Sequence, residues 1–161
     1  MTERKDLAPV VLFVYNRPGH TRRCLESLMK NDLAVESKLY IYSDGARDDA
    51  SEEQLQKIIE VREVIKESKW CGTVEIIERK KNFGLDNSVV EAITNVVNRH
   101  GKIIVLEDDL IVSKGFLKFV NEGLNLYEDD VQVMHISGHV PPLKDVNLPD
   151  TFFLRGGTSA W

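Results

Sequence analysis

Three consecutive acidic residues, Glu107, Asp108 and Asp109, follow a short and mostly apolar stretch at residues 102–106. Neighbouring carboxylates repel one another, so we expect a compensating cation at this place. Carboxylate oxygens suit Mg²⁺ and Mn²⁺, and Mg²⁺ is usually held by one or two carboxylates together with substrate phosphates. The triplet therefore predicts a divalent-metal site. The simpler alternative is a solvated strand end that caps the next helix.

Other polar residues also come directly after apolar runs. Arg17 follows the first run and could face a phosphate, or could be a surface charge at a helix start. Asp44 and Gly45 follow the second run, where Asp-Gly is common in simple turns. Asn82 and Gly84 form a later turn, and a glycine there would let the backbone approach a ligand closely.

Alternating apolar runs and amphipathic stretches must position these side chains. We predict strands at residues 9–15, 38–43, 73–77 and 102–106, with further strand candidates at 133–137 and 151–154. The helices between them are predicted at residues 18–30 and 51–68 and after Asp86 and Ser113. This order predicts one α/β domain over residues 1–161, a Rossmann-like three-layer α/β/α sandwich with a mostly parallel sheet.

The predicted helices carry start signals and apolar faces. Ser51 and Gln54 form a capping box, whereas Asp86 and Ser113 are expected to cap the two later helices. Three sets of residues are expected to face the sheet: Leu55, Ile58, Ile59 and Ile65; Val89, Val90, Ile93, Val96 and Val97; and Phe116, Leu117, Val120 and Leu124.

The connections between strands predict where a ligand would bind. Because crossovers are right-handed, three successive strand–helix units favour the strand order 3-2-1, and the fourth strand then commonly adds beside the first. Ligands bind outside the carboxyl ends of the strands where this order reverses. Here that crevice would be lined by Asn16 and Arg17 on one side and by residues 107–109 on the other.

Composition excludes several functional classes. The chain has 21 lysines and arginines against 26 aspartates and glutamates, a net charge of −5, which argues against a nucleic-acid partner. The one compact basic run, residues 79–81, is interpreted as a solvated loop. The longest apolar run, residues 10–15, is far below the roughly 20 residues of a membrane span.

The two cysteines, Cys24 and Cys71, lie far apart without a CxxC spacing, which favours free thiols over a zinc site or a disulfide. No secretory signal opens the chain. We therefore expect a cytoplasmic protein, either free or peripheral at the inner membrane face. The sequence also lacks GxGxxG after the first strand, GxxxxGK[ST] and GxSxG, which argues against dinucleotide-binding, P-loop and nucleophile-elbow enzymes.

Four segments of the sequence, taken in their order along the chain, resemble a known family. The segments are VLFVYNR at residues 11–17, RRCLESL at 22–28, SDG at 43–45 and VLEDDL at 105–110. Together they resemble the nucleotide-sugar half of GT-A glycosyltransferases, most closely the N-acetylglucosaminyltransferase I type and its bacterial family 2-like relatives. The resemblance runs from about residue 9 to the end of the chain.

The resemblance implies a role for each candidate residue. Asp109 would be the direct ligand of Mn²⁺ or Mg²⁺ in a DxD-like element, Asp108 would approach the ribose and diphosphate, and Glu107 the donor sugar. Tyr15, Asn16 and Arg17 would touch the nucleotide, and Asp44 would read the uracil edge. Asn82 and Gly84 would border the donor pocket.

The function implied by the resemblance is transfer of a sugar from a nucleotide-diphospho-sugar, UDP-linked, to a saccharide or glycan acceptor. A carboxylate general base would lie beyond Trp161, so no catalytic residue is assigned within the chain. We therefore expect a donor-binding part, cut before the acceptor half and inactive alone. The alternatives are a non-catalytic nucleotide-binding module and a sugar nucleotidylyltransferase, although the latter's glycine-rich loop after the first strand is missing.

Overall fold

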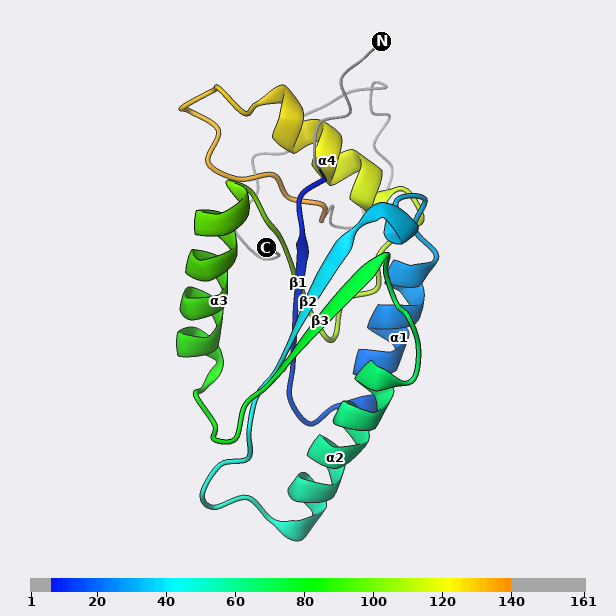
Figure 1. Ribbon diagram of the computed structural model, residues 1–161, viewed down its shortest axis with the longest axis vertical. Coiled ribbons are helices and arrows are strands. Elements are labelled where there is room, and N and C mark those ends of the chain that lie inside the picture. The colour runs from blue at the N-terminus through cyan, green and yellow to red at the C-terminus, as the bar shows by residue number, and fades with distance from the viewer. Residues whose placement is uncertain (1–6, 140–161) are drawn as a thin grey trace, which may run out of the picture.

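The computed structural model describes residues 7–139, and its chain alternates strands and helices (Figure 1). In chain order the elements are β1 (Val10–Val14), α1 (Pro18–Met29), the short 3-10 helix η1 (Ala34–Glu36), β2 (Lys38–Ser43), α2 (Glu52–Lys66), β3 (Thr73–Glu78), α3 (Leu85–His100), β4 (Ile104–Glu107) and α4 (Phe116–Leu126). The four strands between residues 9 and 107 and the helices between them lie where the hydrophobic pattern predicts.

The four described strands form one parallel sheet in the order β3-β2-β1-β4. The predicted reversal of strand order between β1 and β4 is therefore confirmed. Helix α3 covers one face of the sheet, and α1 and α2 cover the other (Figure 1). This is the predicted three-layer α/β/α arrangement.

Alternation along β1 divides the core between the two faces of the sheet. All five residues of β1 are buried. Leu12 packs in the larger cluster with Leu25 of α1 and Leu39 of β2, while Phe13 packs on the other face with Ala92 of α3. Fully burying one such leucine contributes about 1.5–3 kcal/mol. The central strand is thus rigidly placed, and the loop that follows it starts from a fixed point.

The start of α2 is as predicted, but two other predicted caps are wrong. Ser51 and Gln54 form the reciprocal capping box. Helix α3 instead begins after Gly84, whose φ of 75° favours glycine, and Asp86 lies in the first turn of the helix. Helix α4 begins after Gly115 without a side-chain cap, so Ser113 does not fill that role.

The apolar faces predicted for α2 and α3 include residues that are exposed in the structure. Val90 of α3 is 66% exposed, and Leu55 and Ile59 of α2 are 42% and 51% exposed. The buried stripe of α3 consists of Ser88, Ala92 and Val96, because a single straight helix on this face touches the sheet along only one line.

The predicted strand at residues 133–137 is also wrong. No strand pairing includes it among the described residues. The segment instead packs against α4: Ile136 lies beside Gly123, and Gly138 lies beside the ring of Phe116. These two glycines leave room for the close approach, so contacts with a helix replace a strand ladder. The candidate at residues 151–154 lies outside the described residues.

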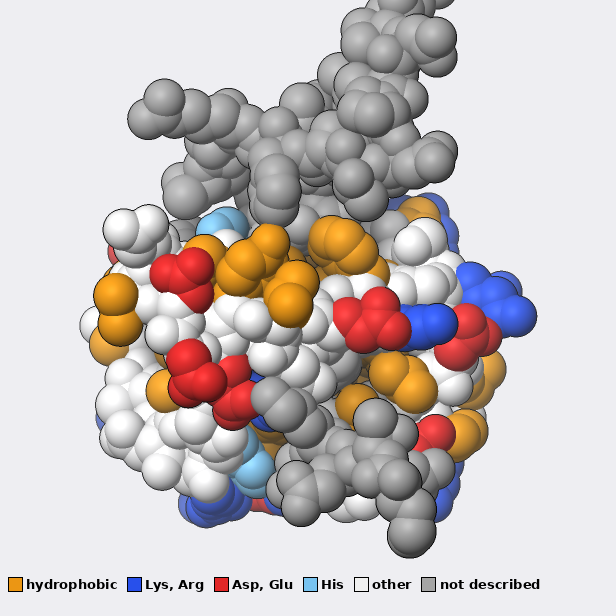
Figure 2. Space-filling view, turned by 90° about the horizontal axis from the view of Figure 1, so that it is seen from above, with side chains coloured by type: hydrophobic (Ala, Val, Ile, Leu, Met, Phe, Trp, Pro, Cys, Tyr) orange, Lys and Arg blue, Asp and Glu red, His pale blue; other side chains and the backbone are white. Residues whose placement is uncertain are grey.

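The end of the molecule that carries α4 exposes several hydrophobic side chains. Phe119 and Leu126 of α4 are 57% and 74% exposed. Figure 2 looks onto this end and shows hydrophobic side chains between acidic ones. The strands begin at this end, so it is opposite the predicted ligand crevice. Within residues 7–139, no helix is long and apolar enough to cross a membrane.

Candidate functional site at the carboxyl ends of the strands

The predicted site residues gather where the parallel strands end. In the register of the sheet, Val14 pairs with Ser43, and Phe13 pairs with Glu107. The loop after β1 therefore lies between Asp44, which follows β2, and Asp108, which follows β4. The predicted neighbourhood of Arg17 and the acidic triplet is confirmed.

Arg17 joins the two aspartates of the triplet. Its Nη2 and Nε donate to the two carboxylate oxygens of Asp108, the latter at 3.3 Å, and its Nη1 donates to Oδ2 of Asp109 at 3.2 Å. The Asp108 side chain is only 4% exposed, whereas those of Arg17 and Asp109 are 44% and 43% exposed. One arginine thus bridges a buried and an exposed carboxylate.

Burial and the ion pair with Arg17 have opposite effects on the pKa of Asp108. Burial raises the pKa of the Asp108 carboxyl above its usual range, and the Arg17 guanidinium opposes that rise. The bond to Asp108 in turn raises the pKa of Arg17. Since Arg17 compensates one of the three negative charges of Glu107, Asp108 and Asp109, two remain at this end of β4.

A buried thiol lies beneath the acidic triplet. Cys24 of α1 donates from Sγ to the carbonyl oxygen of Glu107 at 3.5 Å. Burial raises the pKa of this thiol to about 12, and the charges of Asp108 and Asp109 add to the rise. The predicted free thiols are confirmed, because Cys24 and Cys71 are both free, and both are buried.

On the other side of β1, Asp44 is held by backbone amides. Its Oδ1 accepts from the N–H of Gly45 at 2.9 Å and of Phe83 at 3.0 Å, and its Oδ2 accepts from the N–H of Gly84 at 3.1 Å. The carboxylate therefore fastens the loop after β3 to the end of β2.

Two further contacts tighten the same junction. Asn82 donates from Nδ2 to the carbonyl oxygen of Gly45 at 2.8 Å and accepts on Oδ1 from the N–H of Gly84 at 3.1 Å. A Cβ on Gly45 would lie 2.5 Å from the backbone of Lys81, so this is where a glycine is needed for close approach. At Gly84, by contrast, a Cβ would meet open space, and the positive φ explains the glycine. Asn82 and Gly84 thus shape the loop by their contacts with residues 44 and 45.

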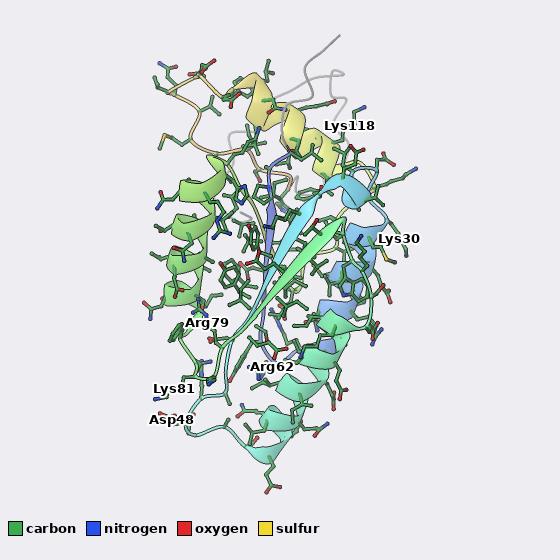
Figure 3. The ribbon with its side chains drawn as sticks, viewed as in Figure 1. Lys30, Asp48, Arg62, Arg79, Lys81 and Lys118 are labelled. Atoms are coloured by element: carbon green, nitrogen blue, oxygen red, sulfur yellow. The ribbon has the colours of Figure 1, made fainter. Side chains whose placement is uncertain are left out.

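Arg79 is a buried residue that the sequence interpretation missed. It belongs to the basic run predicted to be a solvated loop, yet it is only 7% exposed. Its guanidinium donates to Ser88 at 3.0 Å and to Glu91 at 3.1 Å, and it lies 4.2 Å from the centroid of the Phe83 ring. The signal was its position: like Asp44, Arg79 comes directly after a strand. Figure 3 shows it with Arg62 and Lys81 near the ends of β2 and β3.

Tyr15, Asn16 and Glu107 are the remaining predicted site residues, and all three are half-buried around the end of β1. Their side chains form no hydrogen bond with other described residues. They lie beside Arg17, Asp108 and Asp109, which we call the Arg17 group. The predicted contacts of Tyr15 and Asn16 with the nucleotide and of Glu107 with the donor sugar stay predictions.

A divalent cation is compatible with the residues present. Within residues 7–139, no three or more histidine, cysteine or acidic side chains gather as a protein-only metal site. Such a cage is not required, because Mg²⁺ is commonly held by one or two carboxylates plus substrate phosphates. Asp109 is half exposed and uses Oδ2 for Arg17 at 3.2 Å, and the excess negative charge around it favours a cation.

The domain is an open α/β fold with a parallel sheet. In such folds the ligand binds at the switch point, where the strand order reverses, and the charged Arg17 group lies there. The sequence profile of glycosyl transferase family 2 matches residues 10–152. The chain therefore belongs to glycosyl transferase family 2, and its α/β fold is of the GT-A type. No curated protein sequence matches it.

Among solved structures, the chain is similar to a crystal structure of S. aureus TarS 1-349, with 16% identity and a TM-score of 0.49 over 76% of this chain. It is also similar to a second crystal structure of S. aureus TarS, with 15% identity and a TM-score of 0.48 over 82% of this chain. The match spans 33% and 23% of the lengths of those two chains.

Proposed function

We propose that this chain is the donor-binding part of a glycosyltransferase that moves a sugar from a UDP-linked nucleotide-diphospho-sugar to a saccharide or glycan acceptor, with Mn²⁺ or Mg²⁺. The observation that carries the proposal is the group of Arg17, Asp108 and Asp109 at the switch point of a family 2 sheet. A cation and carboxylates side by side suit a ligand that brings phosphates and a divalent metal together.

Arg17 is the group that we expect to bind phosphate. Guanidinium groups bind phosphate in a bidentate manner through their fixed fork of N–H donors. The Arg17 side chain is 44% exposed, so a diphosphate can reach it without unfolding the loop. Asp108, which is buried, then keeps the guanidinium oriented at the end of β4.

Asp109 is the proposed metal ligand, because its half-exposed carboxylate lies at the edge of the same group. When bound, the metal neutralises charge on the departing diphosphate and so assists the leaving group. Glu107 is proposed to approach the donor sugar, and Tyr15 and Asn16 the nucleotide, because they border the same end of β1.

Asp44 is proposed to contribute to the base subsite. Its two oxygens accept three backbone N–H groups through four contacts, because the N–H of Phe83 is shared between both oxygens. The longest of these contacts, 3.2 Å from the Phe83 N–H to Oδ2, is the one that a base N–H would replace. Asn82 and Gly84 would border this subsite as part of the fastened loop.

The proposal is tested by calorimetric titration of the chain with UDP, once with Mn²⁺ and once with EDTA. We expect UDP to bind more tightly with the metal, and we expect ADP and GDP to bind more weakly than UDP. Equal affinity with and without metal would overturn the metal-assisted donor site. Equal affinity for the three nucleotides would overturn the assignment to uridine.

A further inference from the structure

The ring of Phe83 is a large apolar group that stays open on a loop fixed from several sides. Phe83 is 47% exposed. Its N–H lies 3.0 and 3.2 Å from the two oxygens of Asp44, and its carbonyl oxygen accepts from Nδ2 of Asn87 at 3.0 Å. The backbone that carries the ring is thus held in place, while the ring itself contributes little to the core.

One face of this ring is already covered. The Arg79 guanidinium lies 4.2 Å from the centroid of Phe83 and 5.7 Å from that of Tyr42. Ser88 and Glu91 hold the guanidinium in place, so the ring has a fixed backing on its inner side. The exposed part of Phe83 is therefore its outer face and rim, and this face is presented in one orientation.

The surroundings of the outer face indicate what could cover it. The ring belongs to the same junction as Asp44, at the ends of β2 and β3, whereas Arg17 and Asp109 lie at the ends of β1 and β4. Two strand spacings separate these places, roughly 10 Å at about 4.8 Å per strand. A nucleoside diphosphate that lies across the strand ends spans such a distance, with its phosphates at Arg17 and its base near Phe83.

We propose that Phe83 is the stacking platform for the nucleobase of the donor. Bases stack on exposed aromatic rings through their π faces, and hydrogen bonds at the ring edge then distinguish one base from another. In this arrangement Phe83 supplies affinity for the base and Asp44 beside it supplies selectivity. The inference rests on the proposed function, because it assigns the base of the nucleotide to a particular side chain.

The experiment compares Phe83→Leu, Phe83→Trp and a control, Phe119→Leu. Phe119 is a second exposed phenylalanine, 57% exposed, on α4 at the other end of the molecule. Each variant is titrated by calorimetry with UDP and with inorganic pyrophosphate, both in the presence of Mn²⁺. Urea unfolding checks that each variant is folded.

We expect Phe83→Leu to weaken UDP binding about tenfold, the size of a lost stacking contact, and to leave pyrophosphate binding unchanged. Phe83→Trp should keep the UDP affinity, and UDP but not pyrophosphate should change the fluorescence of the new indole. Phe119→Leu should behave as the wild type.

Three outcomes are decisive, and they overturn different claims. If the wild type binds UDP and Phe83→Leu binds it equally well, the stacking platform is wrong and the proposed function stands. If UDP and pyrophosphate binding fall together in Phe83→Leu, the ring supports the loop and does not stack on a base. If the wild type binds no UDP with Mn²⁺, the proposed function fails and the platform fails with it.

Discussion

Asp44 follows β2 and Asp108 follows β4, the two strands that flank β1. The chain holds these two carboxylates by different means. Asp44 accepts hydrogen bonds from three backbone N–H groups, which cannot turn away. Asp108 is paired with the side chain of Arg17, which is 44% exposed and reaches Asp109 as well.

The difference separates a fixed support from a group that can respond to a ligand. The Asp44 junction is complete without a ligand and sets the shape of the loop that carries Phe83. The Arg17 group leaves negative charge uncompensated and offers a partly exposed guanidinium. We therefore expect substitutions at Asp44 to lower stability as well as selectivity for the base, and substitutions at the Arg17 group to act mainly on binding.

The largest expected effect is on binding. Arg17→Ala should weaken the affinity for UDP with Mn²⁺ roughly 10- to 100-fold, because charge-assisted bonds to phosphate are lost. Arg22→Ala is the matched control: Arg22 is equally exposed, at 43%, and its partner is Glu67, the residue that follows α2. Calorimetry should find the control unchanged. Equal losses in both variants would show that the effect is one of general charge.

The next effect is on stability. Asp44→Ala removes the acceptor of three backbone N–H groups, so the free energy of unfolding should fall by about 2 kcal/mol. Asp48→Ala, at an exposed position on the following loop (Figure 3), should stay within about 0.5 kcal/mol of the wild type. Urea unfolding measures both. A change at Asp44 no larger than that at Asp48 would mean that the junction is not a structural support.

A smaller effect is expected at Asp108. Asp108→Asn should change the free energy of unfolding by less than about 1 kcal/mol at pH 7, because loss of the ion pair is offset by relief from burying a charge.

The stability of the wild type relative to Asp108→Asn should depend on pH. Burial raises the pKa of Asp108 in the native state, so on acidification the native carboxyl takes up a proton before the unfolded one does. The wild type should therefore gain stability relative to Asp108→Asn as the pH falls toward the unfolded value of about 3.9. Urea unfolding at several pH values, with EDTA present, measures this. If the wild type instead loses stability relative to Asp108→Asn on acidification, the pKa of Asp108 is not raised in the native state.

The smallest expected effect is at the cysteines. Burial raises the pKa of both Cys24 and Cys71 to about 12, so at pH 8 both are protonated and reached only by opening of the fold. A thiol-reactive dye should label neither in the native chain and both in urea. Fast labelling of Cys24 alone would show that the layer beneath the Arg17 group opens more readily than the rest of the core.

The sequence was informative wherever a local pattern determines the structure. The apolar run of β1, the capping box at Ser51 and the alternation of strands with helices predicted the sheet and its order. From that order followed the meeting of Arg17 with Asp108 and Asp109. These features need only periodicity and the handedness of crossovers.

The features that were missed depend on contacts between distant residues. Arg79 is buried because its guanidinium donates to Ser88 and Glu91, which lie on α3, a helix that begins later in the chain. The engagement of Asp44 by the amides of residues 83 and 84 is likewise a product of tertiary structure. The start of α3 after Gly84 depends on one backbone angle that the sequence indicates only as a glycine.

The metal dependence of UDP affinity in two matched variants tests whether the end of β4 is a metal-assisted donor site. Asp109→Asn breaks an exposed ion pair of 3.2 Å within the Arg17 group, and Asp32→Asn breaks an exposed ion pair of 3.3 Å with Lys114 elsewhere on the surface. We predict that Asp109→Asn abolishes the gain in UDP affinity that Mn²⁺ gives and that Asp32→Asn preserves it. A full metal effect in Asp109→Asn, or its loss in both variants, would contradict a metal-assisted donor site at the end of β4.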